Sequence, residues 1–465
     1  MKSRELVNLG IPRGEPLRVA KAVLAAAAEA GFGKQDLRRT MRDVADNPRS
    51  YTDHEIFGAL AKSLLDDAVE QARFVPRTEP APYKKWGKNL DEGSIDQMRN
   101  ACALPVAVQG ALMPDAHVGY GLPIGGVLAT KEAVIPYAVG VDIACRMKMS
   151  VLDLPVGALT GQADRLTKAL ENETRFGMGA SFRERRAHDV LDRDWRVSPI
   201  TAQHKDKAWS QLGTSGSGNH FVEYGTLEVY GDGLTIPKGT YLALLSHSGS
   251  RGTGASVADH YSKLAMQLHR ELPKELMYLA WLDLDSDAGQ EYWRAMELMG
   301  HYAAANHACI HRHIAKTLGV DVLLDVENHH NFAWKEIHNG ERVVVHRKGA
   351  TPAGEGVLGI IPGSMANPGY VVRGKGNPLS LNSAAHGAGR RMSRTQAIKS
   401  FTWSQTKKLL AERGVTVLSA GLDEVPMAYK DIDEVMAAQS DLVEILARFD
   451  PKIVKMAPAG ERAED

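Results

Sequence analysis

The spacing of apolar residues in the first part of the chain predicts helices. Four apolar residues that share one helix face predict a helix over residues 53–74: Leu60, Leu64, Leu65 and Val69. The alanine-rich segment 18–30 predicts a second helix, which ends at Gly31 because glycine readily takes the left-handed backbone that stops a helix. Segment 35–45 predicts a third helix. Prolines then gather between residues 76 and 83. We therefore expect residues 1–80 to form an N-terminal helical extension and linker.

From about Trp86 the pattern changes to short apolar runs separated by loops. Ser94 and Gln97 have the spacing of a capping box at the start of a short helix. The short apolar runs predict strands at 106–108, 127–130, 148–152, 241–245, 322–326, 342–346 and 370–372. The longer patterns predict helices at 161–172, 254–272, 290–318, 395–413 and 431–448. Between Gly349 and Gly389 the sequence is rich in glycine and predicts binding loops. This mixture favours an α+β fold over residues 81–465, because β and α segments do not alternate regularly.

Composition narrows the functional classes only a little. The chain has 465 residues, 44% hydrophobic and 24% charged, with a formal net charge of zero, which is typical of a globular protein. Any nucleic-acid site must therefore be a local patch. The three cysteines are too few for a disulfide framework, and the first residues show no signal-peptide core. We expect a cytoplasmic protein with no membrane partner.

Five short loop-like segments carry residues that bind metals or attack phosphates. Four of them supply candidate ligands, which are Asp142, Cys145, His220, His247 and His330. A thiolate can bridge two metal ions, and Asp142 lies close enough in sequence to share one with Cys145. Taken singly, Cys145 could be a small buried hydrophobe and each histidine a structural one, so the prediction depends on the whole set. A mixed Asp, Cys and His set suits Mn²⁺, Fe²⁺, Co²⁺ or Zn²⁺ alike.

The fifth segment, Ala385-His386-Gly-Ala-Gly-Arg390, predicts a nucleophile beside a phosphate. Glycines let a phosphate approach the imidazole, and a neutral imidazole nitrogen can attack phosphorus to give a phosphoramidate. A structural turn with a solvated basic face is the alternative. A second basic cluster, Arg175, Arg183, Arg185 and Arg186 with Phe176 and Phe182, fits either an exposed charged face or a nucleic-acid track.

Nine motifs then occur in a fixed order from about residue 86 onward. They are Met113-Pro-Asp115-Ala-His117-Val-Gly-Tyr-Gly-Leu-Pro-Ile-Gly-Gly, Gly140-Val-Asp142-Ile-Ala-Cys145, Gly213-Thr-Ser-Gly-Ser-Gly-Asn219-His220-Phe-Val-Glu223, His247-Ser-Gly-Ser-Arg-Gly, His330-Asn331, His346-Arg-Lys348-Gly-Ala-Thr, Ile361-Pro-Gly-Ser364-Met, His386-Gly-Ala-Gly-Arg390 and Ala428-Tyr429-Lys-Asp. Together they resemble the RtcB family of GTP- and Mn-dependent RNA-splicing ligases. The resemblance implies an RtcB-like α+β catalytic domain over residues 81–465, built around one metal-containing cleft.

The resemblance also implies a role for each matching residue. Asp142, Cys145 and His220 would hold one Mn²⁺, and Cys145, His247 and His330 a second. His386 would take GMP from GTP, and Asp115 matches an acidic residue linked to ligation. The remaining matches would bind GTP or GMP: Asn219, Glu223, Lys348, Ser364, Gly387, Gly389, Tyr429 and Lys455. The implied partners are GTP, an accessory activator protein and RNA. The RNA would carry a 3′-phosphate or 2′,3′-cyclic phosphate at one end and a 5′-hydroxyl at the other.

Four positions depart from the family pattern. Ala144 and Arg146 flank the cysteine where the family commonly has asparagine or glycine before it and glycine after it, and Gly369 replaces a pocket serine. Lys455 matches the family lysine only with a one-residue shift. These departures suggest a specialised paralogue. Two other functions fit the same residues: a metal-dependent phosphoesterase that opens cyclic ends without ligation, and a non-catalytic protein that binds RNA ends.

Overall fold

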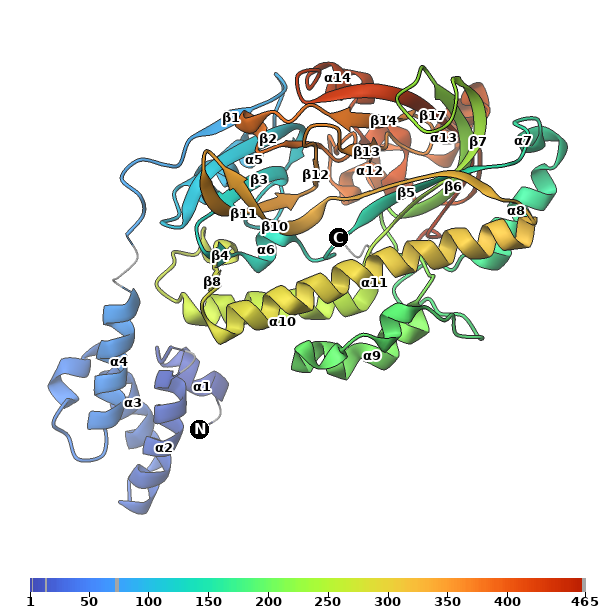
Figure 1. Cartoon of the computed structure of the whole chain (residues 1–465). Coiled ribbons are helices and arrows are strands. Elements are labelled where there is room, and N and C mark those ends of the chain that lie inside the picture. The colour runs from blue at the N-terminus through green and yellow to red at the C-terminus, as the bar shows by residue number, and fades with distance from the viewer. Residues whose placement is uncertain (2, 13–14, 72–74, 462–465) are drawn as a thin grey trace. The chain divides into compact units, whose positions relative to one another are not determined.

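The computed structural model describes residues 1, 3–12, 15–71 and 75–461, which fall into two compact units (Figure 1). The smaller unit comprises Met1–Pro76 together with Met266–Met277. Its helices are α1 (Ser3–Asn8), α2 (Glu15–Glu29), α3 (Lys34–Asp46) and α4 (Gly58–Gln71). Apolar side chains from all four helices are buried in its own core, among them Leu6, Ala20, Met41 and Leu60.

The helices expected at 18–30 and 35–45 are thus confirmed, while the one expected at 53–74 begins only at Gly58. The chain before Gly58 forms turns instead. Residues 72–74 of that prediction and the side chain of Val69 lie outside the described residues.

The larger unit, Arg77–Ala265 with Tyr278–Asp465, is built on two main sheets within its described residues. One has five strands in the order β1 (Tyr83–Lys85), β2 (Ala107–His117), β3 (Ile124–Thr130), β11 (Glu341–Lys348) and β10 (Asn331–His338). The other has eight strands in the order β13 (Leu358–Ile361), β14 (Gly369–Gly374), β17 (Val443–Met456), β6 (Phe221–Val229), β7 (Gly239–Ser248), β5 (Arg146–Leu152) and β9 (Val322–His329), with β16 (Thr416–Ser419) beside β17. The two sheets are joined directly, because β9 runs into β10 through His330.

Helices cover one face of the eight-stranded sheet. The long helix α11 (Asp287–Leu318), yellow in Figure 1, runs along this face and packs with α8 (Ala163–Glu173) against it. Apolar side chains from sheet and helices meet here, including Leu244, Ile310 and Ile314. The other helices of this unit are α5 (Glu92–Cys102), α6 (Pro136–Val139), α7 (Ala158–Gly161), α9 (Pro199–Gln211), α10 (Arg251–Leu268), α12 (Arg394–Ser400), α13 (Trp403–Arg413) and α14 (Ile432–Ala437). None of the helices in the described part of the chain is both long and apolar enough to cross a bilayer.

The structure corrects three of the predicted elements. The helix expected at 431–448 is instead the short α14 followed by strand β17. The one expected at 395–413 is two helices, because Thr402 caps the second with a full capping box. Helix α5 begins at Glu92 rather than after Ser94, since the side chain of Asp91 caps it by accepting the Ser94 N–H.

The expected strands are all present, and most extend further than expected. Among the longer strands, β6, β10 and β17 were not predicted. The glycine-rich segment 349–389 contains β13, β14 and the short strands β12 (Ala350–Pro352) and β15 (Ser383–Ala385), with loops between them. It contains no α-helix among its described residues.

Candidate functional site

Strand register brings the candidate ligands onto one face of the eight-stranded sheet. His247 lies in β7 opposite Met147 of β5 and Phe221 of β6. Cys145 comes two residues before Met147, so its side chain lies on the same side of the sheet, because strand side chains alternate. His330 follows β9, whose Asn328 is also paired with Met147. These positions were expected in loops, but His247 lies within a strand, which fixes its direction.

The five predicted ligands form two triads that share Cys145. In the first, Cys145 Sγ lies 3.1 Å from His247 Nε2, which lies 3.2 Å from His330 Nε2. In the second, Cys145 Sγ lies 3.4 Å from His220 Nε2, which lies 3.2 Å from Asp142 Oδ2. Within each triad, one ligand atom from every residue lies within 4.8 Å of the others, and all five residues are buried. The structure therefore brings together the complete set predicted from the sequence.

The protonation of these side chains suits a bound cation. His247 Nδ1 donates a hydrogen bond to the Asn219 carbonyl at 3.0 Å, so Nε2 presents a lone pair toward Cys145 and His330. Burial lowers the pKa of His247 to about 3 and that of His330 well below its usual value, so both imidazoles are neutral. Three histidine nitrogens, a thiol and a carboxylate thus converge in a buried cluster. A divalent metal would satisfy their lone pairs.

The loop that carries Asp142 and Cys145 is held tightly in place. Asp142 Oδ1 accepts the Ser250 N–H at 3.0 Å, just before the first turn of α10. Ala144, which precedes the cysteine, has φ 57°, a left-handed backbone that suits the asparagine or glycine the family commonly has there. Arg146 lies on the opposite side of the strand and extends toward the Gly300 carbonyl of α11 and Glu327. Its side chain therefore points away from the ligand cluster.

A hydrogen-bond chain, buried except at Asp325, lies behind the ligand strand, on the side covered by α11. Ser246, which precedes His247, contacts both His307 Nδ1 and His311 Nε2 at 2.7 Å. His311 Nδ1 contacts Ser150 at 2.6 Å, and Ser150 donates to Asp325 at 2.5 Å. These hydrogen bonds join α11 to β5 and β7 and fix the position of the helix along the two strands.

His386 follows β15 and is oriented by Asp115 of β2. Asp115 is fully buried, and its Oδ2 lies 2.7 Å from His386 Nδ1 while also accepting the backbone N–H groups of His386 and Gly387 at 3.2 and 3.3 Å. Gly389 is required here, because a Cβ at this position would lie 2.1 Å from the Asp115 carbonyl oxygen. With Nδ1 committed to Asp115, His386 Nε2 is the nitrogen available for chemistry. The sequence points to Asp115 only through the family resemblance. The structure shows its contact with the His386 imidazole.

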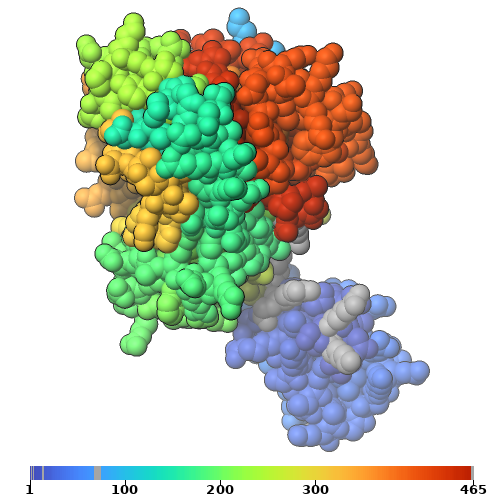
Figure 2. All heavy atoms as spheres, turned by 90° about the vertical axis from the view of Figure 1, so that its right-hand side faces the viewer, coloured from blue at the N-terminus to red at the C-terminus, as the bar shows by residue number. Residues whose placement is uncertain are grey.

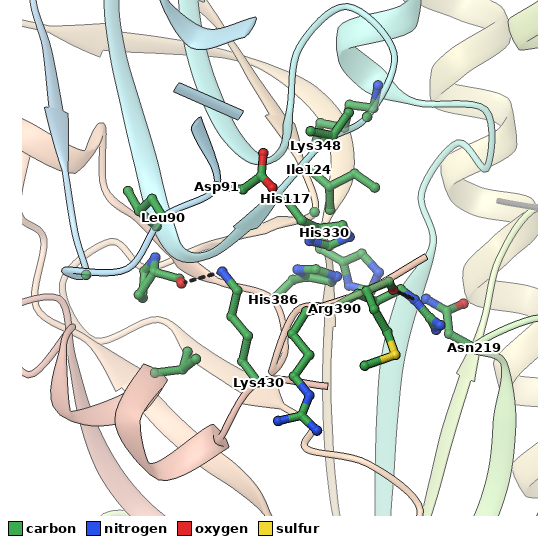
Figure 3. A pocket seen from close by; sticks show the side chains of 18 of the residues that line it. Leu90, Asp91, His117, Ile124, Asn219, His330, Lys348, His386, Arg390 and Lys430 are labelled. Atoms are coloured by element: carbon green, nitrogen blue, oxygen red, sulfur yellow. Dashed lines mark hydrogen bonds between the residues drawn. The ribbon is translucent and has the colours of Figure 1, made fainter. Parts of the chain in front are cut away.

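His386 stands between two cavities, which we call the wide cleft and the narrow pocket. The wide cleft has a volume of about 1480 Å³ and includes Asp142, Cys145 and His220 in its lining. The narrow pocket has a volume of about 90 Å³ and includes His247. Six residues line both cavities: His117, Ile124, Asn219, His330, His386 and Arg390. Figure 3 shows His330 and His386 together at the centre, with ring centroids 4.9 Å apart.

Most of the predicted nucleotide-binding residues line the narrow pocket. These are Asn219, Glu223, Ser364, Gly387, Gly389 and Tyr429. Burial raises the pKa of Glu223 well above its usual range, which favours a carboxylic acid that can donate as well as accept. Lys348 lines the wide cleft instead (Figure 3), and its Nζ donates to the Tyr120 carbonyl at 2.5 Å. Burial lowers the pKa of Lys348 to about 7.

The structure corrects the assignment of Lys455. In β17, Val454 and Met456 pair with Glu223 and Phe221 and line the narrow pocket, so the residue between them faces the other side of the sheet. Lys455 Nζ donates there to the Leu170 carbonyl in the last turn of α8 at 3.3 Å. Figure 2 shows the face on which the blue-green segment of α7 and α8 adjoins orange and red segments from later in the chain.

Two residues near His386 were missed as contributors. Glu424 is 2% exposed, lines the narrow pocket and contacts Arg390, Arg394 and Tyr429. No motif marks it in the sequence. In the sequence, Asn331 is marked only as the neighbour of His330 in a family motif. Its side chain accepts the Gly349 N–H at 2.8 Å and donates to the Asp142 carbonyl at 3.2 Å, so it joins three of the loops that build the site.

Three of the four arginines in the basic cluster at 175–186 have partners within the protein, while Arg183 is exposed. Arg186 is buried, pairs with Glu173 and lies over Phe182, 3.7 Å from the ring centroid. Arg175 donates to backbone carbonyls at the end of α8, and Arg185 pairs with Asp206. These arginines stabilise the local structure. The residue types suggested nucleic acid, but acidic neighbours in space partly offset the charges of Arg185 and Arg186.

Comparison with known proteins places this arrangement in a family. The model of the family described as tRNA-splicing ligase RtcB matches residues 97–199 and 192–456. RNA-splicing ligase RtcB of Escherichia coli (strain K12) is 34% identical over 405 residues, which cover 79% of this chain and 96% of that protein. tRNA-splicing ligase RtcB of Nanoarchaeum equitans is 31% identical over 457 residues, covering 82% and 95%. RNA-splicing ligase RtcB of Mycobacterium bovis is 33% identical over 410 residues, covering 72% and 94%. With the sequence motifs, the ligand triads and these matches in agreement, the chain belongs to the RtcB family.

Proposed function

We propose that this protein is a GTP-dependent RNA ligase that works through a histidine–GMP intermediate. It would join an RNA 3′-phosphate or 2′,3′-cyclic phosphate end to a 5′-hydroxyl end. The observation that carries the proposal is the position of His386, which lines both the narrow pocket and the wide cleft. A group bound to its imidazole in one cavity can be passed to a substrate in the other. This is the arrangement that a covalent carrier between two substrates needs.

In the first step, His386 acts as the nucleophile. The contact of Asp115 Oδ2 with Nδ1 keeps the proton on that nitrogen, so Nε2 carries the lone pair. Nε2 attacks the α-phosphorus of GTP, a nitrogen–phosphorus bond forms, and the bond to the β-phosphate oxygen breaks to release pyrophosphate. Asp115 also stabilises the positive charge that develops on the ring. Asn219, Glu223, Ser364 and Tyr429, which line the narrow pocket, would contact the guanylate.

The ligand triads fit two divalent ions, which we propose to be Mn²⁺. Asp142, Cys145 and His220 would hold one, while Cys145, His247 and His330 would hold the other. When bound, such ions supply charge neutralisation for phosphate oxygens. Cys145 and His220 line the wide cleft and His247 lines the narrow pocket, so the triads border both sides of His386.

The later steps would take place in the wide cleft. A cyclic RNA end is first hydrolysed to the 3′-phosphate, whose oxygen attacks the phosphorus on His386 and takes up GMP. The 5′-hydroxyl then attacks the activated 3′-phosphate, which forms the phosphodiester and releases GMP. Basic side chains line the cleft and suit the RNA backbone: Lys88, Arg391, Arg394 and Lys430. Lys430 is held by the carbonyls of Pro114 and Ala116, on either side of Asp115.

Incubation with GTP labelled at the α-phosphate and Mn²⁺ tests the proposal. We expect label on the protein that is lost in acid and kept in alkali, as a phosphoramidate behaves. Unlabelled RNA with a 3′-phosphate should then remove the label, and added 5′-hydroxyl RNA should give a joined product with release of labelled GMP. Protein that stays unlabelled, yet opens cyclic ends without GTP, would show a phosphoesterase and contradict the proposal.

Replacing Asp115 with asparagine should slow labelling of His386 by roughly 10²- to 10⁴-fold. An amide nearly preserves the shape of the carboxylate, but it neither fixes the proton on Nδ1 nor stabilises a positive ring. Rapid-quench measurement of label uptake gives the rate, while metal content and thermal midpoint report whether the site is intact. Equal labelling rates in the variant and the parent would rule out the orienting role of Asp115.

A further inference from the structure

The loop between β2 and β3 presents an aromatic side chain at the wide cleft. Tyr120 lines this cleft and is 63% exposed, and its neighbour Val118 also lines the cleft with 53% exposure. Large apolar groups left open beside a substrate cleft mark binding surfaces more often than scattered surface residues do. The nucleotide-transfer steps proposed above give Tyr120 no task.

This loop is rigidly held. The Gln97 side chain donates to the Gly119 carbonyl at 2.5 Å and accepts the Gly119 N–H at 3.0 Å. Lys348 Nζ donates to the Tyr120 carbonyl. Gly121 has φ +68°, and a Cβ there would lie 2.6 Å from the Tyr278 carbonyl oxygen, so the loop packs closely on that segment. The ring of Tyr120 is therefore presented on a fixed backbone, which reduces the ordering cost of binding a flat partner.

Two more tyrosines support Tyr120. Its ring centroid lies 5.5 Å from that of Tyr278, which in turn lies 4.9 Å from the ring of Tyr137 in an edge-to-face contact. We call these three residues the tyrosine platform. Tyr278 is 38% exposed, so the platform becomes progressively more open toward Tyr120. Adjacent aromatic rings in such geometry stabilise each other's position.

The platform is directly connected to the reaction centre. Lys348 contacts the Tyr120 backbone and precedes Gly349, where a Cβ would lie 3.1 Å from His386 Cε1. The wide cleft also carries the basic residues named above, interspersed with the carboxylates of Asp91, Asp431 and Glu434. Basic groups that hold a backbone, together with an aromatic ring that meets a base, are the two parts of a single-strand binding site.

We propose that Tyr120 stacks on an unpaired base of the RNA held in the wide cleft and so positions the strand for joining. This inference rests on the proposed function for the identity of the ligand. Stacking accepts any base, because every base offers a flat face, so the contact would not depend on RNA sequence. It would favour single-stranded ends over duplex ends, because only an unpaired base is free to stack on the ring.

Two variants separate the ring from its hydroxyl. Tyr120→Leu removes the flat surface and Tyr120→Phe keeps it, while Tyr230→Leu alters another exposed tyrosine that does not line the cleft. The probes are RNA oligonucleotides with a 3′-phosphate or a 5′-hydroxyl, carrying 2-aminopurine at one of the last three positions. We expect quenching of the fluorescence on binding to the parent, Tyr120→Phe and Tyr230→Leu proteins. Tyr120→Leu should lose the quenching and bind roughly tenfold more weakly.

The ligation assay with the same RNAs supplies the second measurement. Tyr120→Leu should raise the KM for RNA by a similar factor while the rate of labelling by GTP is unchanged. Unchanged quenching and KM in Tyr120→Leu, with normal labelling, would overturn the platform and leave the proposed function intact. Protein that is never labelled but shows Tyr120-dependent quenching would keep the platform as an RNA site and overturn the ligase.

Discussion

Replacing His386 with alanine is expected to abolish both the protein-bound label from GTP and RNA joining, to below the detection limit of either assay. The reason is positional. His386 lines both cavities, and its Nδ1 is held by the Asp115 carboxylate, which can stabilise a positive ring. His117 also lines both cavities, but its Nδ1 contacts only the Asp115 backbone carbonyl. His247 and His330 direct their Nε2 atoms at each other and belong to the ligand triad.

The control for this variant is His313→Ala. His313 lies on α11 and lines neither cavity, so its loss should leave labelling and joining at the parental level. Metal content measured by inductively coupled plasma mass spectrometry should match the parent in both variants, because neither residue belongs to a triad. Label that persists on His386→Ala would place the nucleophile elsewhere and overturn the central assignment.

Replacing Cys145 with serine should disrupt both metal positions at once. Cys145 is the residue shared by the two triads, and a serine hydroxyl does not ionise readily enough to bridge two ions. We expect the apparent affinity for Mn²⁺ to fall by more than about 100-fold, since loss of a direct ligand should exceed the effect of losing a supporting residue. Joining should fall with it. Equilibrium dialysis followed by metal analysis measures the first effect, and the labelling assay measures the second.

Cys309→Ser is the matched control, because Cys309 is also a buried free cysteine but lies on α11 outside both triads. Mn²⁺ that binds the folded protein should raise the thermal midpoint of the parent and of Cys309→Ser, with little effect on Cys145→Ser. Two tightly bound ions in Cys145→Ser would show that the thiol does not bridge them.

The elements that sequence patterns predicted well are those with strong local signals. The expected helix at 290–318 corresponds to α11, and the β-rich runs at 148–152 and 241–245 correspond to β5 and β7. β17 shows the limit of this approach. Glu444, Leu446 and Ala447 favour a helix locally, but this segment pairs with both β14 and β6 in the middle of a sheet. Hydrogen bonds to distant strands outweigh local preference there, and no short window of sequence contains them.

In the candidate site, too, residues with a strong local signal could be predicted, while those defined by long-range contacts could not. Cys145, His220 and His330 could be proposed together because their residue types and motifs indicate metal binding. These signals can be recognised without knowing where the residues lie in the fold. Lys455 could not be placed in this way, since a one-residue change of position in a strand moves a side chain to the opposite face. Glu424 was missed because its importance arises only from contacts with Arg390 and Tyr429, which come from other loops.

The position of His386 between a narrow pocket and a wide cleft also bears on the lifetime of the proposed GMP-bound protein. A phosphoramidate is prone to hydrolysis, and unproductive attack by water would waste GTP. Contacts with the smaller cavity, among buried side chains such as Glu223 and Glu424, would shield part of the guanylate from solvent. Approach to the phosphorus is then open mainly from the side where RNA arrives. The protein could therefore persist in its GMP-bound form between encounters with broken RNA, so that the pace of repair follows the supply of ends.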